Sequence, residues 1–146
     1  MATITSVKER INQLNPASFQ ILCDELLSKE GYPNIVSLGT QDGAEKTTRG
    51  TPDTFFCLSN GKYVFTEYTT QKTGLPAKIR ADIDKCLDEN YTKVPLQEIA
   101  EIVYCHTSSN ISPADDRTLR LLCEENGIKL TLIGIDSLAE KLMKYP

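Results

Sequence analysis

Hydrophobic residues recur along the chain at two spacings, which separate helices from strands. After the helix-starting pair Asn15-Pro16, apolar residues follow at helical spacing until Gly31, and this pattern predicts an amphipathic helix. The same spacing predicts three further helices, over residues 76–90, 113–126 and 137–144. Runs rich in β-branched and aromatic residues predict strands over residues 35–38, 53–58, 62–69, 99–105 and 128–135.

The order of these elements is helix, three strands, helix, strand, helix, strand, helix. A hairpin followed by strand–helix–strand crossovers predicts an α/β fold with a central mixed sheet and helices on both faces. A Rossmann fold is excluded because no G-x-G-x-x-G follows the first strand, and no Walker motif is present. The long polar stretch over residues 39–52 is predicted to be a functional loop.

Composition indicates a single globular domain whose cysteine side chains are reduced thiols. The 146 residues are 40% hydrophobic, and no stretch has the length of a membrane span or the pattern of a signal peptide, so we expect a cytoplasmic protein. Five cysteines without a C-x-x-C pair predict buried thiols rather than disulfides or zinc ligands. A net charge of −4 at first argues against a nucleic-acid partner.

An acidic pair in the predicted hairpin carries the most informative chemistry. Asp53 opens one strand and Glu67 lies near the far end of the next. A three-residue turn over 59–61, with Gly61 in the left-handed conformation, places the two acids directly opposite each other. A two-residue Asn-Gly turn instead pairs Asp53 with Tyr68, and the sequence leaves both turns open. Converging carboxylates repel each other unless a hard cation such as Mg²⁺ or Mn²⁺ binds between them; the alternative is that Asp53 merely starts a strand and Glu67 is solvated.

Further short motifs flank this pair in a recognisable order. They are Phe19-Gln20-Ile21-Leu22, Leu26-Leu27 and Gly31-Tyr32 in the first helix, Thr51-Pro52-Asp53 at the first hairpin strand, Thr107-Ser108-Ser109, and Ile128 to Ile133 leading to Leu138-Ala139. From about residue 16 onward the chain thus resembles the Mrr-like branch of the PD-(D/E)XK nuclease superfamily. The resemblance implies a restriction-endonuclease-like fold (α-β-β-β-α-β-α-β-α), with Asp53 and Glu67 as catalytic ligands of Mg²⁺ or Mn²⁺.

The chain departs from this family's pattern at the motif lysine, which is Thr69 here. Gln71 lies on the correct strand face but is uncharged, whereas Lys72 lies on the other face unless the strand ends or bends. The resemblance implies that one of these two lies near the attacking water or the scissile phosphate. The family's helix glutamate falls on Gln20, which leaves Glu25 as a weaker candidate for a third metal contact.

The resemblance implies a metal-dependent DNA endonuclease. Lys46 and Arg49 in the polar loop, together with Lys78, are the candidate phosphate contacts. Two other hypotheses remain: a catalytically weakened relative that serves as a binding or oligomerisation module, and an unrelated α/β small-molecule binder with no metal dependence. A double-strand break needs two active sites, so an active nuclease is expected to be a homo-oligomer.

The segment from Glu67 to Lys72 and the segment from Gly50 to Thr54 are also similar to the N-terminal effector module of bacterial antiphage STAND ATPases. This implies that residues 1–146 form a single nuclease domain of a longer antiviral-defence protein with a nucleotide-binding sensor region.

The distribution of charge changes the first impression given by the net charge. Residues 46–85 hold seven Lys and Arg against four Asp and Glu, and two of those acids are the proposed metal ligands. The excess of acidic residues therefore lies outside the hairpin region, and the net charge does not exclude a phosphate-bearing substrate.

Overall fold

The computed structural model describes residues 3–32, 36–37, 53–109 and 111–145. Its centre is a five-stranded sheet in the order β1-β2-β3-β4-β5. The first three strands are antiparallel neighbours, and β3, β4 and β5 are parallel. The strands are β1 (Val36–Ser37), β2 (Thr54–Cys57), β3 (Tyr63–Thr69), β4 (Ile99–His106) and β5 (Lys129–Ile133). The α/β class and the mixed sheet predicted from the sequence are thereby confirmed.

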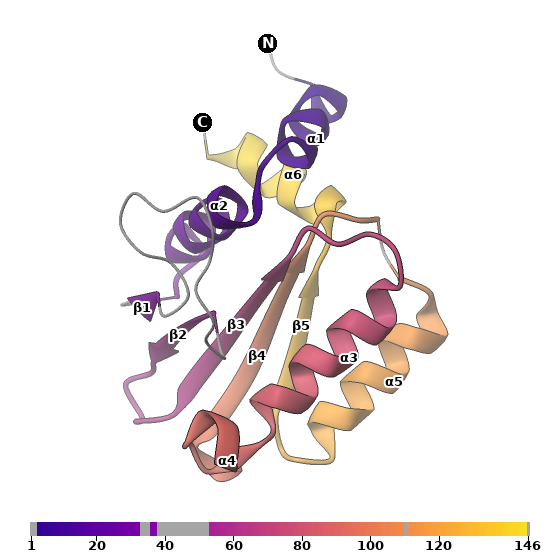
Figure 1. Cartoon of the computed structure of the whole chain (residues 1–146). Helices are drawn as coiled ribbons and strands as arrows, with labels where there is room; N and C mark the ends of the chain where they lie inside the picture. Colours follow the sequence, from indigo (N-terminus) through magenta and orange to yellow (C-terminus); the bar gives the residue numbers. More distant parts are fainter. Residues whose placement is uncertain (1–2, 33–35, 38–52, 110, 146) are drawn as a thin grey trace.

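Helices cover both faces of this sheet (Figure 1). One face packs under α3 (Leu75–Cys86) and α5 (Pro113–Glu124), with a core that includes Phe65, Ile102 and Tyr104. The opposite face packs under α1 (Ile4–Asn12), α2 (Pro16–Lys29) and α6 (Ile135–Lys144), with a core that includes Phe19, Val64 and Cys105. A short α4 (Glu89–Thr92) and a 3₁₀ turn, η1 (Leu96–Glu98), connect α3 to β4.

Residues alternate between these two faces along β3, because successive strand side chains point to opposite sides of a sheet. Phe65 packs toward α3 and Val64 toward α2. The same alternation sends Glu67 and Thr69 toward α3, and Tyr68 toward α2. Near its carboxyl end, β3 therefore presents the carboxyl group of Glu67 on the α3 face and the phenol of Tyr68 on the α2 face.

Helix boundaries follow local capping groups. The side chain of Asn15 accepts a hydrogen bond from Ser18 N at the start of α2, and Ser112 accepts one from Asp115 N at the start of α5. Helix α1 was not predicted, although Thr3 and Ser6 form a capping box at its start. Among the described residues, no helix is long and apolar enough to cross a bilayer.

Candidate active site

The hairpin register places Asp53 opposite Glu67. Thr54 pairs with Thr66, and Asp53 N donates to Thr66 O over 3.1 Å. At the other end, Leu58 N donates to Lys62 O over 2.8 Å, which leaves three residues in the turn. Gly61 adopts φ 86°, a left-handed conformation that glycine accepts without steric cost. The three-residue turn is therefore confirmed, and the alternative pairing of Asp53 with Tyr68 is wrong.

The two carboxyl groups of this pair lie close enough to shift each other's pKa, in a largely buried position. Glu67 is only 4% exposed, and burial is the main cause that raises its pKa, followed by the charge of Asp53. Burial also raises the pKa of Asp53, although the neighbouring Glu67 and the hydrogen bond from Tyr68 N (3.0 Å) oppose this shift. Two neighbouring buried carboxyl groups disfavour being ionised together, and a bound cation relieves this repulsion.

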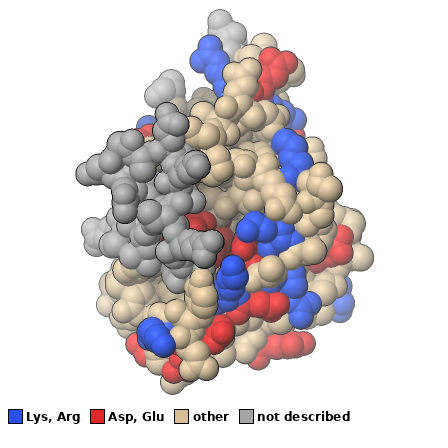
Figure 2. All heavy atoms as spheres, in the orientation of Figure 1, with Lys and Arg blue, Asp and Glu red and all other residues tan. Residues whose placement is uncertain are grey.

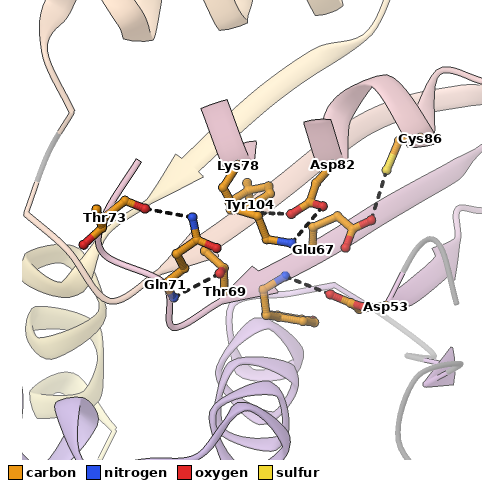
Figure 3. A network of polar contacts seen from close by, with 10 residues as sticks. Asp53, Glu67, Thr69, Gln71, Thr73, Lys78, Asp82, Cys86 and Tyr104 are labelled. Atoms are coloured by element: carbon orange, nitrogen blue, oxygen red, sulfur yellow. Dashed lines mark hydrogen bonds and ion pairs between the residues drawn. The ribbon is translucent and has the colours of Figure 1, made fainter. Parts of the chain in front are cut away.

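Helix α3 adds a thiol and a third acid to this pair (Figure 3). Cys86 Sγ lies 3.4 Å from Glu67 Oε1, on the buried side of the glutamate. Asp82 accepts a hydrogen bond of 2.5 Å from the hydroxyl of Tyr104 on β4, and its charge raises the pKa of Glu67 further. The site is thus a group of three acids with few strong donors.

A cation from the same helix borders these acids. Lys78 Nζ lies 3.2 Å from Asp82 Oδ1, one helical turn away, and its charge lowers the pKa of Asp53. Figure 2 shows Lys and Arg side chains gathered beside acidic side chains over α3. The other basic side chains of α3 include Arg80, which pairs with Asp84. Positive charge therefore adjoins the acidic pair on its α3 side.

Helix α2 supports the pair from the opposite face of the sheet. Gln20 Nε2 donates to the main-chain oxygen of Asp53 over 3.2 Å. Asp24 accepts hydrogen bonds from the hydroxyls of Thr54, at 3.0 Å, and of Tyr68. Burial is the main cause that raises the pKa of Asp24, to about 6. These contacts fix the backbone at the start of β2, which sets the position of the Asp53 side chain.

Two residues predicted to act beside the pair lie elsewhere. Strand β3 ends at Thr69, so the strand alternation that guided the prediction does not extend to the residues beyond it. Gln71 is exposed, and its amide donates to Thr73 O over 2.8 Å. Lys72 Nζ donates to Thr107 O over 2.5 Å and to Asn12 Oδ1 over 2.6 Å, so the structure does not bring it to the acidic pair.

The structure does not bring Glu25, the predicted third metal contact, to the acidic pair either. Glu25 is exposed on α2, and Asp24 is the acid of that helix that faces the sheet. Two candidate phosphate contacts, Lys46 and Arg49, lie outside the described residues. The structure therefore brings together Asp53, Glu67 and Lys78 from the predicted set.

The sequence analysis missed Asp24, Asp82 and Tyr104. A signal for Asp82 was present, because Ile79, Asp82 and Cys86 share the buried face of α3 at helical spacing. An acid on an apolar helix face needs a partner, and only the fold shows that Tyr104 is that partner. The sequence signal for Asp24 was weaker. Asp24 lies four residues after the buried Gln20 and therefore on the same side of α2.

The acidic side chains of this site supply only part of the ligand set that a hard divalent cation needs. The described residues include no group of three His, Cys, Asp or Glu side chains arranged to hold a metal. Asp53 and Glu67 nevertheless supply two carboxylates, and Mg²⁺ commonly binds through one or two carboxylates together with water and substrate phosphate. The pair thus fits a cation whose remaining ligands come from water and substrate.

Comparisons of the chain with protein-family models, with curated proteins and with solved structures gave no match.

Proposed function

We propose that this chain is a divalent-cation-dependent endonuclease domain that hydrolyses phosphodiester bonds in DNA. The observation that carries the proposal is the pair of Asp53 and Glu67, which the hairpin register places opposite each other in a largely buried position. A buried acid pair costs folding free energy, so its presence at the open end of a hairpin favours a functional role.

The strand order supports the finer proposal of a restriction-endonuclease-like fold. An antiparallel meander leads into β3, which continues through α3 into the parallel strand β4. The acidic pair lies where β2 begins and β3 approaches its end, which is where the motif resemblance expects the catalytic acids. Helices on both faces complete the arrangement expected from the sequence.

In this proposal Asp53 and Glu67 hold Mg²⁺ or Mn²⁺. A cation bound there neutralises charge that develops on the phosphate and lowers the pKa of a bound water. Gln20 holds the main chain of Asp53, and Cys86 packs against Glu67, so both carboxyl groups keep their orientation.

Lys78 takes the place of the absent strand lysine in this proposal. Thr69 provides no charge at the motif position, and Lys72 is engaged by Asn12 and Thr107. Lys78 lies at the acidic site, where its ion pair with Asp82 holds the ammonium group. From there it contacts a substrate phosphate and orients it toward the acidic pair.

A second candidate function follows from the absence of the motif lysine. Thr69 stands at the position of the motif lysine, and a domain without a working cation there binds DNA or assembles with other copies without cutting. In either case we propose a role as an effector in bacterial antiphage defence, as a homo-oligomer and within a longer STAND ATPase chain. A double-strand break then requires two copies that face opposite strands.

Plasmid nicking tests the two functions. Supercoiled plasmid is incubated with the domain in EDTA, Mg²⁺ or Mn²⁺, alongside Asp53→Asn, Glu67→Gln and the control Asp84→Asn. Asp84 is exposed on the same helix as Lys78 and pairs with Arg80, away from the acidic pair. The nuclease proposal expects metal-dependent nicking that both site variants abolish and the control retains.

Binding without cleavage, in a concentrated or cross-linked sample, favours the second candidate. Absence of both binding and cleavage contradicts both proposals and agrees with an unrelated α/β small-molecule binder.

A further inference from the structure

A second cleft opens beyond the carboxyl ends of β4 and β5, on the α5 side of the sheet. Its volume is about 590 Å³, within the range of sites that bind small molecules. Its lining residues are His106, Ile111, Pro113, Asp116, Arg120 and Leu132. None of these residues belongs to the acidic site.

The position of the cleft in the fold is typical of ligand sites. The chain leaves β4 for α5 on one face of the sheet and leaves β5 for α6 on the opposite face (Figure 1). Connections that diverge in this way open a crevice outside the carboxyl ends of the two strands, where open α/β sheets bind their ligands.

His106 is a buried polar group that faces this cleft. The residue is 2% exposed, and Nδ1 accepts a hydrogen bond of 3.2 Å from Ser108 N. Burial, followed by the charge of Lys72, lowers the pKa of His106, so the imidazole is neutral at pH 7. Because Nδ1 is an acceptor, the single proton of the neutral ring is on Nε2.

This Nε2–H has no hydrogen-bond acceptor within the parts of the chain that the structure describes. The Nε2 atom is open to the cleft. His106 is one of the residues that line the cleft, and none of its polar atoms is both fully enclosed and unpaired. Gly134 leaves room for the ring, because a Cβ there would come within 2.9 Å of Cε1 and 3.3 Å of Nε2. A donor that borders a cleft and has no partner among the described residues favours a ligand that supplies an acceptor.

The walls of the cleft limit the chemistry of that ligand. Asp116 and Arg120 form an ion pair across one helical turn of α5, and Arg120 also donates to Leu130 O over 2.8 Å. These charges largely cancel, whereas Lys72 adds a positive field at His106. Ile111, Pro113 and Leu132 provide apolar surface. The site therefore favours an oxygen acceptor attached to an apolar body and disfavours a cation.

We propose that this cleft binds a small molecule with a flat or aliphatic apolar body and a carboxylate or carbonyl oxygen that accepts the hydrogen bond from His106 Nε2. The site is independent of the nuclease proposal.

The chain has a single histidine, so its imidazole ¹⁵N signals need no assignment to a residue and the test is direct. The ¹⁵N-labelled protein is titrated at pH 7 with benzoate, benzamide and benzylamine, which share a ring and differ in the polar group. We expect benzoate and benzamide to shift the Nε2 signal saturably, and benzoate to bind about tenfold more tightly than benzylamine.

Two substitutions separate the cleft from the rest of the surface. Leu132→Trp fills the cleft, whereas Leu121→Trp places the same ring on the exposed face of α5, where Leu121 is 38% exposed. We expect benzoate binding to be lost in the first variant and retained in the second. Equal binding of benzoate and benzylamine to the wild-type protein, or no shift of the Nε2 signal, overturns the proposal even if Leu132→Trp fails to fold.

Discussion

Strand β3 separates a partly buried acid, Asp24, from a buried acid, Glu67, and the two differ in their hydrogen-bond donors. On the α2 face, Asp24 accepts hydrogen bonds from the hydroxyls of Thr54 and Tyr68. On the α3 face, Glu67 has the weak thiol donor of Cys86 and lies next to the carboxyl groups of Asp53 and Asp82. Hydroxyl donors satisfy the first acid within the protein, whereas the second accepts a hydrogen bond from a weak thiol donor. The comparison indicates a structural role for Asp24 and a ligand-binding role for Glu67.

The largest expected effect is on plasmid nicking, which substitutions at Glu67 and at Asp24 should affect differently. Glu67→Gln and Asp53→Asn remove the charges proposed to hold the cation, so we expect plasmid nicking to fall by at least about 100-fold. Asp24→Asn keeps an acceptor for Thr54 and Tyr68, and we expect it to retain activity within about threefold. Initial nicking rates at saturating Mn²⁺ measure the difference. A loss in Asp24→Asn equal to that in Glu67→Gln would show that the two acids do not differ in function.

A smaller effect on activity is expected from the cation that borders the α3 face. Lys78→Met removes the proposed phosphate contact, and we expect nicking to fall by about 10-fold to 100-fold, with partial recovery in Lys78→Arg. Arg80→Met, which removes an exposed cation from the same helix, is the matched control. Equal rates for the two methionine variants would remove Lys78 from the site.

The acid on the α2 face is expected to affect stability rather than activity. Burial raises the pKa of Asp24 to about 6, so the folded protein binds this proton more tightly than the unfolded chain does. This contribution to stability is present below pH 4 and is lost as the pH rises to about 6. Asp24→Asn removes the dependence, so we expect the variant to gain about 2 kcal/mol relative to wild type between pH 4 and pH 7.5.

Urea unfolding of both proteins at the two pH values measures this gain. The other acids titrate in both proteins and cancel in the difference. A constant difference between wild type and Asp24→Asn across this pH range would show that Asp24 has no raised pKa.

The smallest effect concerns a lysine that lies away from both acids. Lys72 ties the chain after β3 to Asn12 and Thr107. We expect Lys72→Met to lower the free energy of unfolding by about 1 kcal/mol and to leave the nicking rate of the folded protein unchanged. A loss of nicking at unchanged stability would restore Lys72 to the active site.

The sequence predicted those parts of the molecule that local rules decide. The helix start at Asn15-Pro16 depends on backbone preferences, and the sequence predicted it. The sequence narrowed the hairpin turn to two alternatives, and the structure has the three-residue turn ending at Gly61, which aligns Asp53 with Glu67. Strand β3 does end at Thr69, which was the condition for Lys72 to reach the site, but the lysine instead contacts Asn12 and Thr107. Asp24 and Asp82 join the region of Asp53 and Glu67 only through packing of helices on opposite faces of the sheet, which no local pattern specifies.

Thermal unfolding with and without Mn²⁺ tests most directly the claim that Asp53 and Glu67 form a cation site. Burial next to other acids raises the pKa of Glu67, so Glu67→Gln is expected to unfold at a higher temperature than wild type in EDTA at pH 7.5. Millimolar Mn²⁺ is expected to raise the unfolding temperature of wild type but not that of Glu67→Gln or Asp53→Asn, because a ligand that binds the folded state stabilises it. Equal responses of all three proteins to Mn²⁺ would contradict the account.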